Sequence, residues 1–281
     1  MTNNFLKILD VKFHPYSSRK VINEILKLLS SRNRGFIVTP NPEFLVKANK
    51  NDHFKSILNN AFISIPDGTG ILWAAKFLSL KTSRNIIIKY LQSLWQLLYT
   101  GLSLVFYPNY CRTAIPERVT GIDIIYRIFD FSQNRGFKIY LLGAQPGVAK
   151  RAAAIIKNKY PGIQIVGSAS GSPQKKLDVK TRSKINSSDA DILLVAYGAP
   201  KQEYWMQRNF SNLSSVKLAI GVGGAFDFIS GSVKRAPNLM RNLGLEWAYR
   251  LIKEPSRIIR IANATLYFPY LIFKDKLKYY E

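Results

Sequence analysis

The sequence has few of the residues on which disulfide-bonded proteins and most zinc proteins depend. Its 281 residues include one cysteine, Cys111, and two histidines, His14 and His53. A single cysteine excludes an internal disulfide and a four-cysteine zinc or iron–sulfur site, and it fits a reducing compartment. The histidines are too far apart in sequence to indicate a histidine-based zinc site. No Ser–His–Asp arrangement is supported around either of them.

Acidic residues are also scarce. The chain has 17 Asp and Glu against 41 Lys and Arg, which gives a formal net charge of +24. This excess predicts attraction to an anion: a nucleic acid, a membrane surface or a phosphorylated substrate. The basic residues are spread along the chain, without a run of five or more and without a zinc-finger or RRM signature. With 47% hydrophobic residues the bulk of the chain is not disordered, and one large domain or two small ones are expected.

No uninterrupted hydrophobic run is long enough for a clean membrane span. Residues 1–10 lack the pattern of a secretory signal. Residues 86–107 come closest to a span, but their polar residues recur on one helical face and leave an apolar face that includes Trp95. Basic residues flank this segment. The pattern favours an amphipathic helix, either in a membrane interface or packed on the domain core, over a true span.

Short apolar runs that end in Gly, Pro or Asp alternate with helical stretches. The predicted strands are Gly35–Thr39, Ala61–Ile65, Lys138–Leu142, Gln164–Ser168, Asp191–Ala196 and Val216–Val222. The predicted helices include Ser18–Ser31, Glu43–Asn49, Gly121–Ser132, Gly147–Lys159 and Lys201–Arg208. This alternation predicts an α/β protein with a Rossmann-like, mostly parallel sheet and helices on both faces. Ligands of such sheets bind beyond the carboxyl ends of the strands.

Five of the loops that follow these strands predict a binding site. They begin at Thr39, Pro66, Gly143, Tyr197 and Gly223; four of them contain glycine, and two of them open helices. Glycine allows close approach of the backbone, and helix N-termini bind phosphate. The loops therefore predict a site for a phosphorylated, nucleotide-bearing ligand. The spacing of a P-loop and of a dinucleotide fingerprint is absent.

Carboxylates are few in these loops: Glu43, Asp67, Glu203 and Asp227. Asp67 lies in a Pro-Asp-Gly-x-Gly turn, where it is either a general base for a hydroxyl nucleophile or a turn-forming residue. The Asp189-Ala-Asp191 sequence has the form of a metal-binding D-x-D motif. It precedes a strand, at the end away from the expected ligand, and is interpreted as a solvated strand entry.

Taken together, the loops resemble those of the WecG/TagA/CpsF glycosyltransferases. The matching motifs are Thr39-Pro-Asn-Pro-Glu43, Pro66-Asp-Gly-Thr-Gly70, Pro116-Glu-Arg-Val-Thr-Gly121, Leu142-Gly-Ala-Gln-Pro-Gly147, Gly198-Ala-Pro-Lys-Gln-Glu203, Gly221-Val-Gly-Gly-Ala-Phe-Asp227, Arg235-Ala-Pro237, Gly244-Leu-Glu-Trp-Ala-Tyr-Arg250 and Glu254-Pro-Ser-Arg257. They cover nearly the whole chain in the order of the family. The resemblance implies transfer of an N-acetylmannosamine-type sugar from UDP to a polyprenyl-diphosphate-linked sugar. It also implies inversion, no metal or other cofactor, and a role in teichoic acid or related cell-envelope polysaccharides.

The resemblance also assigns residues. Asp67 matches the proposed base and Arg118 a further catalytic position. The expected substrate-binding residues are Thr39, Asn41, Gly143, Gly147, Gly198, Lys201, Gln202 and Gly223. Arginines of the C-terminal segment, Arg250, Arg257 and Arg260, are expected at the diphosphate, because guanidinium groups bind phosphate oxygens in a bidentate manner.

One departure from the family is an insertion of roughly thirty residues between Phe77 and Pro116, at about 81–115. We expect a core at 1–230 and a basic, helical, membrane-binding appendage at 231–281, with the insertion in the membrane interface beside the site. The expected location is the cytoplasmic face of an anionic membrane, and a homo-oligomer is possible. The alternatives are a UDP-sugar-binding protein without catalysis and a nucleic-acid-binding protein. The second is motivated by charge alone, and we expect no nucleic-acid partner.

Overall fold

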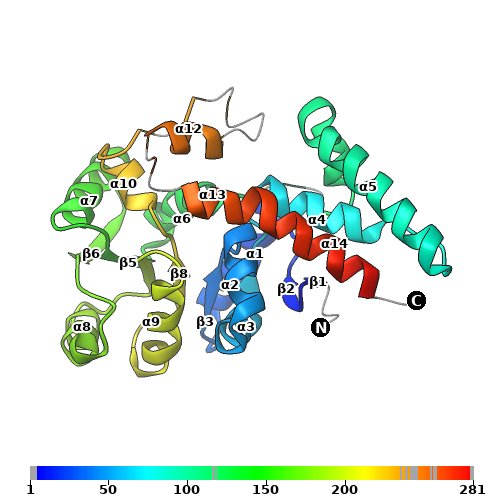
Figure 1. The fold of residues 1–281 in the computed structure, drawn as a ribbon. Helices are drawn as coiled ribbons and strands as arrows, with labels where there is room; N and C mark the ends of the chain where they lie inside the picture. The colour runs from blue at the N-terminus through cyan, green and yellow to red at the C-terminus, as the bar shows by residue number, and fades with distance from the viewer. Residues whose placement is uncertain are drawn as a thin grey trace.

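A six-stranded parallel sheet lies at the centre of the residues that the computed structural model describes, which are 5–115, 117, 119–234, 236–237, 240, 246–253, 255 and 258–278 (Figure 1). Its strands are β3 (Gly35–Val38), β4 (Ile63–Ser64), β5 (Lys138–Gly143), β6 (Gln164–Ala169), β7 (Ile192–Ala196) and β8 (Leu218–Gly221). They are arranged in the order β4-β3-β8-β7-β5-β6, and all neighbours are parallel. The predicted α/β fold with a parallel sheet is confirmed.

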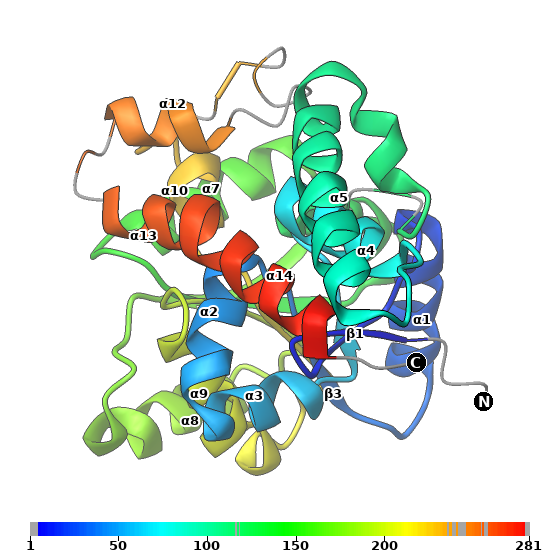
Figure 2. The same ribbon diagram turned by 45° about the vertical axis from the view of Figure 1, so that its right-hand side comes forward.

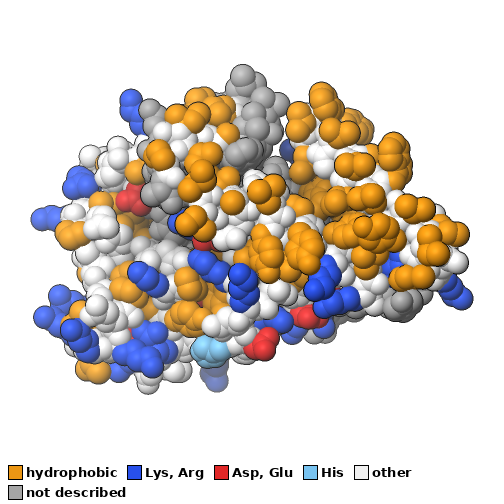
Figure 3. All heavy atoms as spheres, in the orientation of Figure 1, with side chains coloured by type: hydrophobic (Ala, Val, Ile, Leu, Met, Phe, Trp, Pro, Cys, Tyr) orange, Lys and Arg blue, Asp and Glu red, His pale blue; other side chains and the backbone are white. Residues whose placement is uncertain are grey.

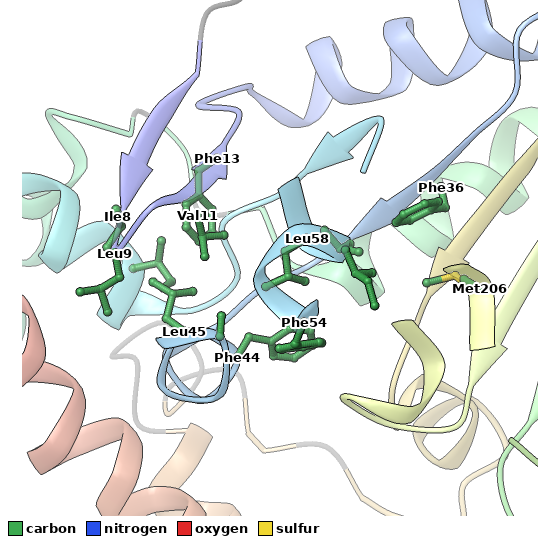
Figure 4. Close-up of a cluster of buried hydrophobic side chains, with 14 of the residues drawn as sticks. Ile8, Leu9, Val11, Phe13, Phe36, Phe44, Leu45, Phe54, Leu58 and Met206 are labelled. Carbon is green, nitrogen blue, oxygen red and sulfur yellow. The ribbon is translucent and has the colours of Figure 1, made fainter. Parts of the chain in front are cut away.

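Two hydrophobic clusters cover the two faces of the sheet, because successive side chains of a strand point to opposite sides. In β5, Ile139 and Leu141 belong to one cluster, and Tyr140 and Leu142 belong to the other. The first cluster includes residues of α1 (Ser18–Ser30), α6 (Gly121–Arg135), α7 (Val148–Lys159) and α10 (Ala225–Ile229). The second includes residues of α2 (Pro42–Lys50), α3 (Asp52–Asn59), α4 (Thr69–Ser79), α8 (Asp178–Asn186) and α9 (Lys201–Asn209) (Figure 4).

The sequence prediction missed an N-terminal hairpin and several helices. Strands β1 (Leu6–Ile8) and β2 (Val11–Phe13) pair antiparallel, and Leu9 and Asp10 between them have φ values of 49° and 62°. Such a turn usually carries glycine or asparagine, so the sequence lacked the usual signal. Helix α4 was missed because most of its residues are buried, which removes the polar–apolar periodicity of an amphipathic helix.

The C-terminal segment contributes helices α12 (Glu246–Lys253), α13 (Ile258–Ala262) and α14 (Phe268–Lys278), with a π-helical segment at Asn263–Tyr267. Figure 2 shows α14 beside α2 and α5 (Ile86–Phe106). Phe268 and Ile272 of α14 are buried in the second cluster. The Lys276 ammonium donates hydrogen bonds to the carbonyls of Phe77 and Leu80 at the end of α4.

Helix α5 is the predicted amphipathic segment. No helix within the described parts of the chain is long and apolar enough to cross a membrane. Membrane binding by the C-terminal helices and the division at residue 230 stay predictions.

Candidate active site

A polar pocket of about 680 Å³ lies at the carboxyl edge of the sheet, where loops from all six strands meet. Its lining residues include Thr39 and Asn41 after β3, Asp67 after β4, Ala144 and Gln145 after β5, Ser170 to Pro173 after β6, Tyr197 to Ala199 after β7, and Val222 to Ala225 after β8. Thr120 at the start of α6 and Arg260 of α13 complete the walls. Its volume is within the range of small-molecule sites.

Asp67 is held at this edge by a contact between two neighbouring loops. Its backbone N–H donates a hydrogen bond of 3.0 Å to the carbonyl of Pro40, which joins the β4 loop to the β3 loop. The next residue, Gly68, has a φ of 92°, a conformation that favours glycine, and α4 begins directly after it without an acidic residue in its first turn. A pocket-lining carboxylate thus directly precedes the N-terminus of a helix, where the helix dipole favours negative charge.

Thr39 and Asn41, two of the predicted substrate-binding residues, line the same pocket. The Asn41 side chain accepts a hydrogen bond of 3.2 Å from the N–H of Phe44 and so caps α2. Thr39 lies against the start of α6, where a Cβ on Gly121 would be 3.3 Å from the Thr39 methyl group. Glycine at the end of the Pro116–Gly121 motif therefore permits the close approach of these two elements.

Gln202 lines the pocket and also connects two of the loops that form it. Its side chain is buried, and its Oε1 accepts a hydrogen bond of 3.0 Å from the backbone N–H of Gly223 in the β8 loop. Its Nε2 donates to Oε1 of Glu203 at 2.7 Å. A Cβ on Gly221 would lie 2.7 Å from that nitrogen, so the motif requires glycine there. Gln202 therefore joins the β7 and β8 loops.

Glu203 is fully buried beneath this connection. Burial raises the pKa of its carboxyl to about 7, although the hydrogen bond from Gln202 acts in the opposite direction. Its Oε2 atom has no hydrogen-bond partner within the described residues. Burial without a cationic partner in contact favours the protonated form of a carboxyl group, so Glu203 is close to half protonated at neutral pH.

Arg260 lies at the rim of the pocket in an ion pair with Glu43. Its NH2 group lies 2.7 Å from Oε2 of Glu43, while Lys47 lies 2.7 Å from Oε1. Burial alone raises the pKa of the Glu43 carboxyl, but the hydrogen bonds from Arg260 and Lys47 bring it below its ordinary value. The ion pair connects α13 to the helix that follows β3, and it places one predicted diphosphate-binding arginine at the site.

The predicted glycines differ in their positions. Gly198 and Gly223 line the pocket. Gly143 has a φ of 112°, and a Cβ there would be 2.6 Å from the carbonyl carbon of Ala196, so it allows the β5 and β7 loops to meet. Gly147 precedes α7 in the left-handed conformation. Lys201 is exposed at the start of α9 and is not among the residues that line the pocket.

Arg118 and Arg257 lie outside the described residues, as does the side chain of Arg250. Glu117, the neighbour of Arg118, is fixed: its Oε2 accepts a hydrogen bond of 2.8 Å from the N–H of Ser18 at the start of α1. The Pro116–Gly121 motif is therefore attached at this residue to a core helix.

Sequence reasoning missed the β6 loop as a part of the pocket. The β6 loop has a usable signal, since Gly171-Ser-Pro follows a predicted strand, but it opens no long helix directly. Asp227 was recognised among the loop carboxylates, and it also lines the pocket. The Asp189-Ala-Asp191 sequence lies at the opposite edge of the sheet, where Asp191 accepts a hydrogen bond from the N–H of Lys138. Within the described parts of the chain, no three His, Cys, Asp or Glu residues form a metal-binding cluster.

The fold and the pocket define the class: an α/β protein that binds its ligand at the carboxyl ends of a parallel sheet, with loops suited to phosphate. Within this class, the chain belongs to the WecG/TagA/CpsF family of glycosyl transferases, whose model matches residues 6–98 and 83–281. It is therefore a glycosyltransferase. The two matched segments overlap at residues 83–98, which include the first half of α5, so the break in the match falls within the predicted insertion.

Two similar proteins are both called N-acetylglucosaminyldiphosphoundecaprenol N-acetyl-beta-D-mannosaminyltransferase. The protein of Bacillus spizizenii strain W23 is 30% identical over 237 residues, which cover 84% of this chain and 78% of that protein. The protein of Bacillus subtilis strain 168 is 29% identical over 242 residues, which cover 86% and 80% respectively.

Proposed function

We propose that the protein transfers N-acetylmannosamine, or a closely related N-acetylhexosamine, from a UDP-sugar to N-acetylglucosamine on a polyprenyl diphosphate. The names of the two similar Bacillus proteins support this donor and acceptor. The observation that carries the proposal is the position of Asp67 in a pocket formed by the loops of all six strands. The product is a lipid-linked disaccharide of cell-envelope polysaccharide synthesis, made at the cytoplasmic face of the membrane.

The proposed reaction is a single displacement with inversion. Asp67 accepts the proton of the acceptor hydroxyl as its oxygen forms a bond to the anomeric carbon of the donor. The bond between that carbon and the β-phosphate oxygen breaks, and UDP leaves with the bonding electrons. Attack from the face opposite UDP inverts the configuration at the anomeric carbon.

The leaving UDP requires positive charge, which we assign to protein groups and not to a metal. Arg260 at the pocket rim is the described arginine best placed for this role, since it needs only to exchange the Glu43 carboxylate for a phosphate oxygen. The N-terminus of α7, which follows Gln145, adds partial positive charge. Arg118, Arg250 and Arg257 are assigned to the same task from the resemblance.

The test is transfer by Asp67→Asn with UDP-N-acetylmannosamine and a short-chain, water-soluble lipid-diphosphate-GlcNAc analogue. We expect kcat to fall roughly 10²–10⁴-fold, the usual contribution of a general base, while binding of UDP is retained. Asp52→Asn, at an exposed position far from the pocket, is the matched control. Near-normal transfer by Asp67→Asn, or a loss confined to Asp227→Asn, would remove Asp67 as the base. Activity that disappears with EDTA and returns with Mg²⁺ would contradict metal independence.

A further inference from the structure

Helix α5 is packed with its polar side toward the protein. Lys89, Ser93 and Thr100 are its buried residues, although the helix lies on the surface. The Thr100 hydroxyl accepts a hydrogen bond of 3.0 Å from the indole N–H of Trp73 in α4. The Gln92 side chain accepts a hydrogen bond from the backbone N–H of Ser83, and the Gln96 side chain donates one to the carbonyl of Lys81. These contacts fix the orientation of the helix about its own axis.

The opposite side of α5 is apolar and exposed, which reverses the usual arrangement of a surface helix. Leu91, Trp95 and Val105 are 59%, 66% and 66% exposed. The exposed large hydrophobic residues of this helix and its C-cap are Ile86, Ile87, Ile88, Tyr90, Leu91, Leu94, Trp95, Leu98, Leu102, Val105, Phe106 and Tyr107. At about 100 Å² each they form a patch on the order of 1,000 Å², above the 300–600 Å² that is typical of a monomer's largest patch.

This apolar surface continues onto the C-terminal helices. Tyr90 of α5 contacts Phe273 of α14, with ring centroids 5.7 Å apart. Ile258, Ile259 and Leu266 are also exposed. Figure 3 shows hydrophobic side chains over both regions on one face, with Lys and Arg side chains along its lower border. Arg260, at the pocket rim, belongs to the same C-terminal segment, so the surface adjoins the mouth of the site.

In the sequence, the charged residues that flank α5 are all basic. Between Asp67 and Glu117 the chain has no acidic residue, whereas Lys81, Arg84 and Arg112 flank the helix. A second copy of this chain would bring the same basic groups together, but an anionic lipid surface neutralises them. Trp95 and Tyr107 are aromatic residues of the type that prefers the depth of lipid headgroups. The charge and the composition therefore favour a bilayer as the occupant.

We propose that α5 lies in the plane of an anionic membrane, with the side chains of Leu91, Trp95 and Leu98 inserted below the headgroups. The inverted packing of the helix makes this surface available without a conformational change. The docking orients the pocket toward an acceptor anchored in the same membrane, a consequence that rests on the proposed function. The binding itself requires only the described surface.

Co-sedimentation with phosphatidylglycerol vesicles tests the proposal on the full chain without substrates. The triple variant Leu91→Ser/Trp95→Ser/Leu98→Ser should bind at least roughly tenfold more weakly, since large apolar groups leave the bilayer. Ile155→Ser/Val179→Ser is the matched control, because these exposed residues lie on α7 and α8, away from α5 (Figure 1). Undiminished binding of the triple variant would overturn the proposal. The proposal would also be overturned if the wild type were a dimer, the triple variant were a monomer, and both bound vesicles equally well.

Two further measurements concern depth and charge. Brominated acyl chains should quench Trp95 fluorescence, and that quenching should be lost in Trp95→Phe; its persistence would contradict insertion of this side chain. Arg84→Gln should weaken binding to anionic vesicles about fivefold and leave the weak binding to phosphatidylcholine unchanged. Equal loss on both lipids would contradict the assigned role of charge.

Activity measurements separate this proposal from the proposed function. The triple α5 variant should retain normal transfer to the short-chain, water-soluble acceptor and lose at least roughly tenfold with an acceptor embedded in vesicles. Equal activity of the variant and wild type on both acceptors would contradict a role for α5 in reaching the acceptor. No transfer by wild type to either acceptor would refute the proposed function, while the vesicle-binding result would still stand.

Discussion

Replacing Glu203 by glutamine should change how the stability of the protein depends on pH. The folded-state pKa of about 7 lies above the ordinary value of 4.5, mainly because the carboxyl is buried. The folded protein therefore holds this proton more tightly than the unfolded chain does. The resulting stability is fully present below about pH 4.5 and is lost as the pH rises through about 7.

The magnitude follows from the two pKa values. At about 1.4 kcal/mol per pKa unit, the difference between 4.5 and about 7 corresponds to about 3 kcal/mol, most of which falls between pH 5 and 8. The side chain introduced by Glu203→Gln does not ionise, so the variant lacks this pH-dependent contribution. Over this interval its free energy of unfolding should therefore decrease by about 2–3 kcal/mol less than that of the wild type. The glutamine oxygen can still accept the hydrogen bond from Gln202.

The assay is urea denaturation of both proteins at pH 5, 6, 7 and 8, comparing the two proteins at each pH. Other titrating groups, such as His14, are common to both and cancel in the difference. Glu24→Gln is the control: the hydrogen bond from Lys20 lowers the pKa of that carboxyl, so it is ionised in both the folded and the unfolded protein over nearly all of this interval, and its difference from the wild type should stay almost constant. Parallel stability profiles for Glu203→Gln and the wild type would refute a raised pKa at Glu203.

Three further predictions concern contacts around the pocket. Gly221→Ala should destabilise the fold by about 1–3 kcal/mol in urea denaturation, since its Cβ would enter the space of the amide below the β8 loop; an unchanged midpoint would contradict this. Arg260→Ala should raise KM for the UDP-sugar roughly tenfold with little loss of stability, whereas Lys47→Ala should not; equal effects would contradict a diphosphate contact. Ser18→Ala removes a hydroxyl bond to Glu117 and should cost about 1–2 kcal/mol by urea denaturation; no loss would contradict this anchor.

The six strands could be predicted because buried parallel strands are short, continuous apolar runs that end in glycine, proline or aspartate. The same glycine, proline and aspartate residues marked the loops that contain Thr39, Asn41 and Asp67, because the carboxyl ends of parallel strands lie at one edge of the sheet. The position of Lys201 could not be predicted in this way. It is the first residue of α9, and the direction of a side chain there depends on the preceding turn and not on its place in a motif.

The amphipathic pattern of residues 86–107 predicted the two faces of α5 but not which face would contact the protein. A hydrophobic period reports only that two faces differ. Which face contacts the protein depends on partners that are distant in sequence. Trp73 is one of them, because its indole N–H donates a hydrogen bond to the Thr100 hydroxyl. Gln202 illustrates the same limit: its place in a loop motif predicted substrate contact, and it lines the pocket, but the hydrogen bond by which its amide joins two loops could not be predicted from the motif.

The attachment of α14 to α4 has a consequence for the catalytic geometry. Helix α4 has 11 residues, so it is about 16 Å long, and it begins two residues after Asp67. Its far end is held by the ammonium of Lys276, which donates hydrogen bonds to the carbonyls of Phe77 in the last turn and of Leu80 directly after it. The C-terminal helix α14 therefore fixes one end of α4, and the proposed base, Asp67, directly precedes the other end. Shortening the chain before α14 would remove this attachment, so a truncated protein should transfer sugar poorly even to an acceptor that has no lipid tail.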